Sequence, residues 1–252
     1  MEPNVDFLAA EIDVDHHWVF AIPASASTVS QQCNEILDHV ETVLDCLFPF
    51  TKFRSCEMTV QVFEEDIDYQ SWINSGSKAV QTLEVRPIES DTDEDRVTID
   101  AIRKQIERNS DSGRYIVVSS LSFREGETQI KLAESDRYIS RGETDRYRTV
   151  KRGDVRGPAN EDPIRIDIKD TGLPLSDTRG YEVRIRSPTE IWFGRDEVTQ
   201  VNQERFAEVL SCLHEALPEG DRHFGGEPRG EGKYMAREQP WNRPLVPWFD
   251  DE

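Results

Sequence analysis

The chain has 252 residues, of which 36% are hydrophobic, enough for one large domain or two small ones. Its formal net charge is −20, and 23 of its 30 basic residues are Arg. A surplus of carboxylates, with Arg preferred over Lys, is typical of cytosolic proteins from salt-accumulating organisms, and it disfavours broad binding to phosphate polyanions. The N-terminus has no basic and apolar leader, and no run of 18 apolar residues occurs. We therefore expect a cytoplasmic protein without a membrane span.

The N-terminal part of the sequence predicts strands followed by a helix. Residues 7–14 and 18–22 predict two short strands, with a turn at Asp15-His16 between them. Apolar residues at helical spacing then predict an amphipathic helix over 28–47, the most strongly patterned element of the chain.

The middle of the chain alternates between strand and helix patterns. Residues 53–63 alternate apolar and polar side chains, which predicts a half-buried strand, and a shorter helix is predicted over 97–108. A strand over 115–123 follows, and the segment 124–127, Arg-Glu-Gly-Glu, is predicted to turn the chain back into a strand at 128–132.

The last third repeats the strand-and-helix theme. Residues 164–168 and 181–186 predict strands, and a second main amphipathic helix is predicted over 202–217. The Pro- and Trp-rich segment 218–252 predicts an extended C-terminal tail.

These elements predict an α+β fold with a mostly antiparallel sheet and its helices on one face. We expect a single domain over 1–217, or two strand–strand–helix halves at 1–132 and 163–217. An Arg- and Tyr-rich hairpin or loop at 134–156 would join the halves.

The four cysteines lie at scattered positions without a CxxC pair or zinc spacing. Cys33 and Cys56 fall on apolar faces of a predicted helix and strand. We therefore expect Cys33, Cys46, Cys56 and Cys212 all to be free thiols, with a disulfide or a metal site as the weaker alternative.

Two patterns would suit a divalent metal ion. Asp13, Asp15 and His17 would share one face of an extended strand, as carboxylate and imidazole ligands require. The favoured interpretation is that this is the solvent-facing side of an acidic edge strand.

The second metal pattern is a short nuclease-like constellation. Asp167 and Lys169 stand two apart on a predicted strand, and Asp154 lies upstream. Carboxylates of this kind can hold magnesium while the Lys stabilises charge. The triplet is short and arises often by chance, so a metal-dependent hydrolase or nuclease is kept as an alternative function.

The segment 134–156 carries a local charge of +2 inside the acidic chain. Arg and Tyr side chains together are typical of protein interfaces and of surfaces that stack on single-stranded nucleic acid. The candidate partner-binding residues here are Arg137, Tyr138, Arg141, Arg146, Tyr147, Arg148 and Arg152.

The C-terminal tail supplies three aromatic candidates for binding, Trp241, Trp248 and Phe249. Exposed aromatic side chains are costly unless they dock, either on the body of the protein or on a partner.

No specific catalytic signature occurs: GxGxxG, P-loop, HExxH and nucleophile-elbow patterns are all missing from the sequence. The sequence therefore favours a non-enzymatic protein-binding role, inhibitory, immunity-like or in assembly, without a cofactor. A metal-dependent hydrolase and a nucleic-acid-binding accessory factor acting through 134–156 remain as alternatives.

Overall fold

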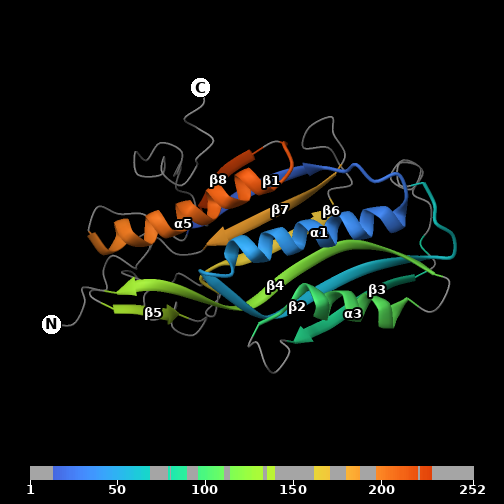
Figure 1. Cartoon of the computed structure of the whole chain (residues 1–252), viewed down its shortest axis with the longest axis horizontal. Coiled ribbons are helices and arrows are strands. Elements are labelled where there is room, and N and C mark those ends of the chain that lie inside the picture. Colours follow the sequence, from blue (N-terminus) through green and yellow to red (C-terminus); the bar gives the residue numbers. More distant parts are fainter. Residues whose placement is uncertain are drawn as a thin grey trace.

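A computed structural model describes residues 14–68, 79, 81–89, 96–110, 114–132, 135–139, 162–170, 180–187, 197–220 and 222–228. These residues form an eight-stranded sheet and three helices, which confirms the α+β class (Figure 1). In chain order the elements are β1 (Val14–Pro23), α1 (Val29–Leu47), β2 (Thr51–Phe63), β3 (Gln81–Glu89), α3 (Ile99–Asn109), β4 (Tyr115–Leu132), β5 (Ser135–Ile139), β6 (Arg165–Asp170), β7 (Gly180–Ser187), α5 (Glu197–Ala216) and β8 (Arg222–Pro228).

The sheet interleaves strands from the two ends of the chain. Its order is β3-β2-β4-β6-β7-β1-β8, with β5 paired to the end of β4, and every pair of neighbours is antiparallel. The N-terminal strand β1 therefore lies between two of the last strands, β7 and β8.

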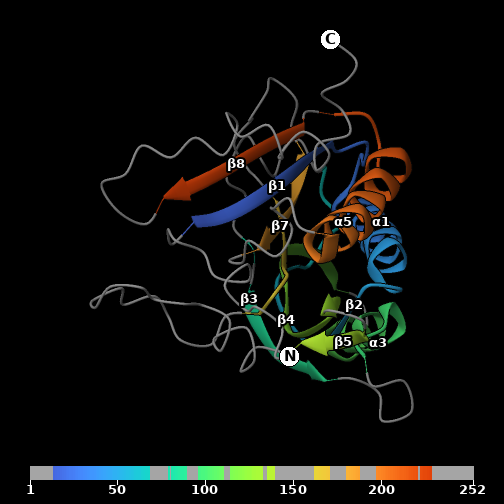
Figure 2. The same cartoon turned by 90° about the vertical axis from the view of Figure 1, so that its left-hand side faces the viewer.

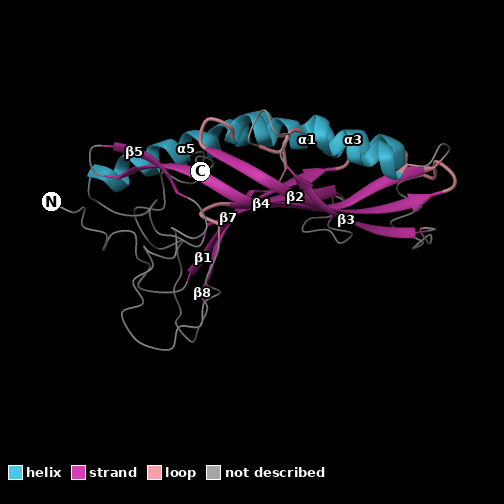
Figure 3. Ribbon diagram, turned by 90° about the horizontal axis from the view of Figure 1, so that it is seen from below, coloured by secondary structure: helices cyan, strands magenta, loops and turns pink. Residues whose placement is uncertain are grey.

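Each helix connects two strands that run in the same direction. α3 crosses from β3 to β4 over β2, and α5 crosses from β7 to β8 over β1, both toward the β8 edge of the sheet. α1 crosses from β1 to β2, toward the β3 edge, between strands that run the other way. Such crossovers are right-handed in nearly all proteins, and this handedness puts all three helices on the same face. Figure 3 shows the helices as one layer, and Figure 2 shows α1 and α5 side by side.

The hydrophobic core lies between the helix layer and the sheet. Trp18 and Phe206 are fully buried there and meet edge to face at 4.8 Å between ring centroids, and Phe50 stacks on Phe206 at 5.8 Å. These contacts join β1, α5 and the turn between α1 and β2, so α5 is held to the sheet by large apolar side chains.

The three helices predicted from periodicity are confirmed. The predicted helices 28–47, 97–108 and 202–217 correspond to α1, α3 and α5. Thr28 caps α1, since its side-chain oxygen accepts a hydrogen bond from the backbone N–H of Gln31.

Two turns expected from the sequence are not formed. Asp15-His16 lies within the single strand β1, and the segment 124–127 continues β4 instead of reversing it. β4 bends at Glu125, whose backbone φ of 56° lies in the left-handed region. Gly126 follows, where a Cβ atom would lie 3.1 Å from the Phe53 ring. The Arg-Glu-Gly-Glu segment therefore bends a long strand that is held in register by β2 on one side.

Two strands were not expected from the sequence. β3 forms one edge of the sheet, and β8 forms the other, in a segment that we predicted to be part of an extended tail. The rest of the predicted tail, 229–252, lies outside the described residues.

The expectation of four free thiols is wrong for two of them. Cys46 of α1 and Cys212 of α5 form a disulfide, with 5.8 Å between their Cα atoms. Cys33 and Cys56 are buried free thiols, as predicted. Burial raises the pKa of Cys33 to about 11 and that of Cys56 to about 12.

Among the described helices, none is long and apolar enough to cross a membrane.

Candidate functional site

The face of the sheet opposite the helices carries a row of charged side chains on neighbouring strands. Ile166 and Ile168 of β6, and Val183 and Ile185 of β7, are buried in the core under the helix layer. Side chains alternate between the two faces of a strand. The helix-free face therefore carries Arg165, Asp167 and Lys169 from β6, and Glu182, Arg184 and Arg186 from β7.

The strand register brings these side chains together. Asp167 lies opposite Arg184, and Lys169 lies opposite Glu182. On the other side of β6, Asp167 lies opposite Ser122 of β4. We call this group the arginine face and define it by Ser122, Arg124, Arg165, Asp167, Lys169, Glu182, Arg184 and Arg186.

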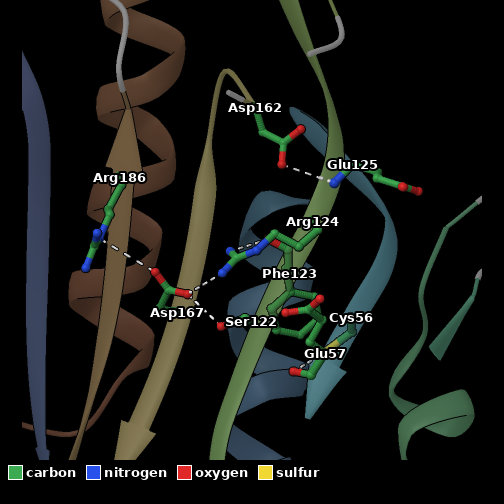
Figure 4. Close-up of polar contacts among 9 residues, drawn as sticks. All are labelled: Cys56, Glu57, Ser122, Phe123, Arg124, Glu125, Asp162, Asp167 and Arg186. Atoms are coloured by element: carbon green, nitrogen blue, oxygen red, sulfur yellow. Dashed lines mark hydrogen bonds and ion pairs between the residues drawn. The ribbon is translucent and has the colours of Figure 1, made fainter. Parts of the chain in front are cut away.

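Asp167 is the centre of the arginine face. Its Oδ1 accepts hydrogen bonds from Ser122 Oγ at 2.7 Å and from Arg124 Nη2 at 3.1 Å. Its Oδ2 lies 3.6 Å from Arg186 Nε. Figure 4 shows Arg124 and Arg186 approaching this carboxylate from opposite sides, one from β4 and one from β7.

The surroundings of Asp167 keep it ionised. Burial alone would raise the pKa of this carboxyl group. The hydrogen bond from Ser122 and the positive charges of Arg124 and Arg186 outweigh burial and hold the pKa below its usual value. Asp167 is 4% exposed, so its charge is a fixed part of the protein's interior.

The cations of the arginine face keep contact with solvent while the carboxylates do not. The side chains of Arg124, Arg184 and Arg186 are 25%, 32% and 26% exposed. Arg184 pairs with Glu182 at 2.8 Å, and the Glu182 side chain is only 8% exposed. The acids thus lie beneath a surface formed by guanidinium groups.

Two of the guanidinium groups, those of Arg165 and Arg184, have a donor that no protein group accepts within the described residues. The Nε atoms of Arg165 and Arg184 are buried and have no hydrogen-bond partner within the described part of the chain. A guanidinium group has five N–H donors, so one carboxylate cannot satisfy it.

The net charge of the arginine face is opposite to that of the whole chain. It contains five cations, Arg124, Arg165, Lys169, Arg184 and Arg186, and two carboxylates, Asp167 and Glu182. Five minus two gives +3, against −20 for the whole sequence.

The predicted metal ligands are brought together only in part. Asp167 and Lys169 do share the helix-free face of β6, but Asp167 is engaged by Ser122, Arg124 and Arg186. Asp154 lies outside the described residues. Over the described ranges, no group of three or more His, Cys, Asp or Glu residues is placed to hold a metal ion.

The other predicted metal pattern falls at the start of β1. His17 lies opposite Arg186 of β7, and Asp15 lies opposite Glu227 of β8. Asp13 lies outside the described residues.

Most of the predicted partner-binding residues also lie outside the described residues. Arg137 and Tyr138 belong to β5, which pairs with the end of β4. The remaining ones, beyond the described ranges, are Arg141, Arg146, Tyr147, Arg148, Arg152, Trp241, Trp248 and Phe249.

Sequence reasoning missed Arg124, Arg165, Arg184 and Arg186. The signal was present as a period of two: Arg165, Asp167 and Lys169 alternate with isoleucines, and Arg184 and Arg186 flank Ile185. Only the pairing of β6 with β4 and β7 shows that these short patterns form one surface.

Comparison with known proteins gives no relative: no family model, no curated protein and no solved structure matches the chain.

Proposed function

We propose that this protein is a non-enzymatic binding protein, and that its arginine face receives a carboxylate-bearing segment of a protein partner. The observation that carries the proposal is the gathering of guanidinium groups around one buried carboxylate on the helix-free face. An inhibitory, immunity-like or assembly role in a salt-rich cytoplasm would suit such a surface.

The chemistry of the arginine face favours a carboxylate ligand. Arg pairs with carboxylates through two parallel N–H···O bonds, which adds geometric specificity to the charge attraction. The Arg184 side chain is about one third exposed, so its outer N–H groups can reach a ligand, and the neighbouring Arg186 side chain is about one quarter exposed. Asp167 pairs with Arg186, and Glu182 pairs with Arg184. These ion pairs fix the positions of the two guanidinium groups before a ligand arrives.

The distribution of charge favours a short acidic segment over a long polyanion. Nucleic acid extends well beyond a patch of three strands, and the surrounding chain with its net charge of −20 would repel it at low salt. A peptide segment with a few carboxylates needs to contact only the arginine face.

The binding test uses a labelled peptide with alternating Glu residues and a matched peptide in which Gln replaces Glu. Fluorescence anisotropy should detect binding of the Glu peptide and not of the Gln peptide. Arg184→Glu should weaken binding of the Glu peptide by about tenfold or more, since it places a like charge in the site.

Arg103→Glu is the matched control for this substitution. Arg103 lies on α3 in the helix layer, its side chain is 34% exposed, and it pairs with Asp38 at 3.0 Å, much as Arg184 pairs with Glu182. This variant changes the net charge equally and should leave peptide binding unchanged. Equal loss in both variants would indicate a general charge effect and contradict the proposal. Preferential binding of a single-stranded oligonucleotide would support the nucleic-acid alternative instead.

A further inference from the structure

The four cysteines fall into two pairs that differ in exposure. Cys33 and Cys56 are buried, and their raised thiol pKa values leave almost no thiolate at neutral pH. Cys212 lies on the exposed side of α5, and Cys46 is half-buried on α1. Only the pair that forms the disulfide is within reach of a thiol in solution.

The disulfide joins two neighbouring helices that are far apart in the sequence. Cys46 is in the last turn of α1 and Cys212 is in the C-terminal half of α5, 166 residues later. α5 is also anchored by the buried side chains of Phe206, Leu210 and Leu213. The core contacts of α5 therefore do not depend on the disulfide.

Cys212 is exposed, and exposed disulfides are the ones that thiols reduce readily and that serve regulatory roles. We infer that the Cys46–Cys212 bond is a reversible redox clasp that fixes the C-terminal half of α5, and with it β8, against α1. β8 follows α5 after a short connection and pairs with β1 at the edge of the sheet. The inference does not depend on the proposed binding function.

The reaction that opens the clasp needs a dithiol reductant. One thiolate of the dithiol attacks Sγ of Cys212, which breaks the Cys212–Cys46 bond, and Cys46 leaves as a thiolate that takes up a proton. The second thiol of the dithiol, as its thiolate, then attacks the mixed disulfide and releases Cys212, which takes up a proton in turn. The dithiol is oxidised to its own disulfide, and the protein gains two electrons and two protons.

The test compares the full-length protein after treatment with an oxidised or a reduced dithiol, without denaturant. Thiol counting after unfolding should give two thiols for the oxidised protein and four for the reduced one. The reduced protein should stay folded, with its Tm lowered by about 5–10 °C, because a link across a loop this long constrains the unfolded chain. Hydrogen exchange should become faster in the C-terminal half of α5 and in β8, while β2 and β4 stay protected.

The double variant Cys46→Ser/Cys212→Ser is the control. It should have the Tm of the reduced protein and should not respond to the dithiol. Four thiols after treatment with the oxidised dithiol, reduction only in denaturant, or global unfolding on reduction would each overturn the inference.

Discussion

One buried carboxylate organises the arginine face. One carboxylate oxygen of Asp167 accepts hydrogen bonds from Ser122 and Arg124, and the other forms an ion pair with Arg186. Without it, two guanidinium groups from different strands would be held close together with no counter-charge between them. The charge of Asp167 is therefore needed both for stability and for the geometry of the proposed binding surface.

Replacing Asp167 with Asn should destabilise the protein by about 2–4 kcal/mol, because it leaves partly buried cations without their partner. Urea unfolding at pH 7 measures the effect. Asp38→Asn is the matched control, since Asp38 pairs with Arg103 at a similar distance of 3.0 Å but its side chain is 70% exposed. That variant should lose less than about 1 kcal/mol, as exposed ion pairs usually do. Equal losses would show that burial of the pair has no energetic role.

The difference in stability between the wild type and Asp167→Asn should depend on pH. The pKa of Asp167 is lowered in the folded protein, so its contribution is complete above the unfolded pKa of about 4 and is lost as pH falls through the lower folded value. The stability difference between wild type and Asp167→Asn should be constant between about pH 7 and pH 5 and should shrink below about pH 4. A difference that grows on acidification would contradict this assignment.

At the scale of the elements, the helices were predictable and the partners of the strands were not. α1 buries Val29, Cys33, Ile36, Val40 and Val43 at helical spacing, and that spacing is visible in the sequence. Its connection to α5 through Cys46 and Cys212 was not, because no local pattern relates two residues 166 positions apart.

The edge strand β3 was missed for a physical reason. Leu83 and Val85 face the core and alternate with the exposed side chains of Thr82 and Glu84, but this alternation is short and Pro87 interrupts it in the sequence. Edge strands have a neighbour on one side only, and their polar side chains resemble those of a loop.

The arginine face could be predicted only in fragments. Arg165 and Arg184 each lie in a strand that was predicted, and the alternation around them implied a polar face. The register between β4, β6 and β7 decides that Arg124 and Arg186 both reach Asp167, and register is a long-range property of the fold.

The side chain of Asn202 links α5 to the end of β4. Asn202 is fully buried, accepts a hydrogen bond from the backbone N–H of Lys131 at 2.6 Å and donates one to the Lys131 carbonyl at 3.1 Å. An amide group is suited to this task because it both accepts and donates.

Asn202→Ala should lower stability by about 1.5–3 kcal/mol, since both backbone groups of Lys131 lose their side-chain partner. Hydrogen exchange should also become faster at Lys131. Glu204→Ala is the control on the same helix, because Glu204 is exposed, and it should change stability by less than about 0.5 kcal/mol. If the two variants unfold at the same urea concentration, Asn202 does not hold the helix to the strand.

At the scale of the whole molecule, the charge of −20 is the dominant property. Like charges oppose the compact state, and added salt reduces this repulsion by shortening the screening length to about 3 Å at 1 M. The two buried carboxylates of the arginine face are neutralised by neighbouring cations, so the uncompensated charge lies elsewhere on the molecule.

Stability should therefore rise with potassium chloride, by a few kcal/mol on the order-of-magnitude estimate from charge screening between dilute buffer and 1 M salt. Urea unfolding is the suitable measurement, because urea carries no charge of its own. The triple variant Glu204→Gln/Glu208→Gln/Glu215→Gln removes three exposed charges from α5 and changes the net charge from −20 to −17. It should be more stable than wild type in dilute buffer, and the two proteins should converge at high salt. Equal stability of the wild type at both salt concentrations would mean that its carboxylates do not repel one another in the folded state, and the salt-adapted interpretation of the sequence would then be wrong.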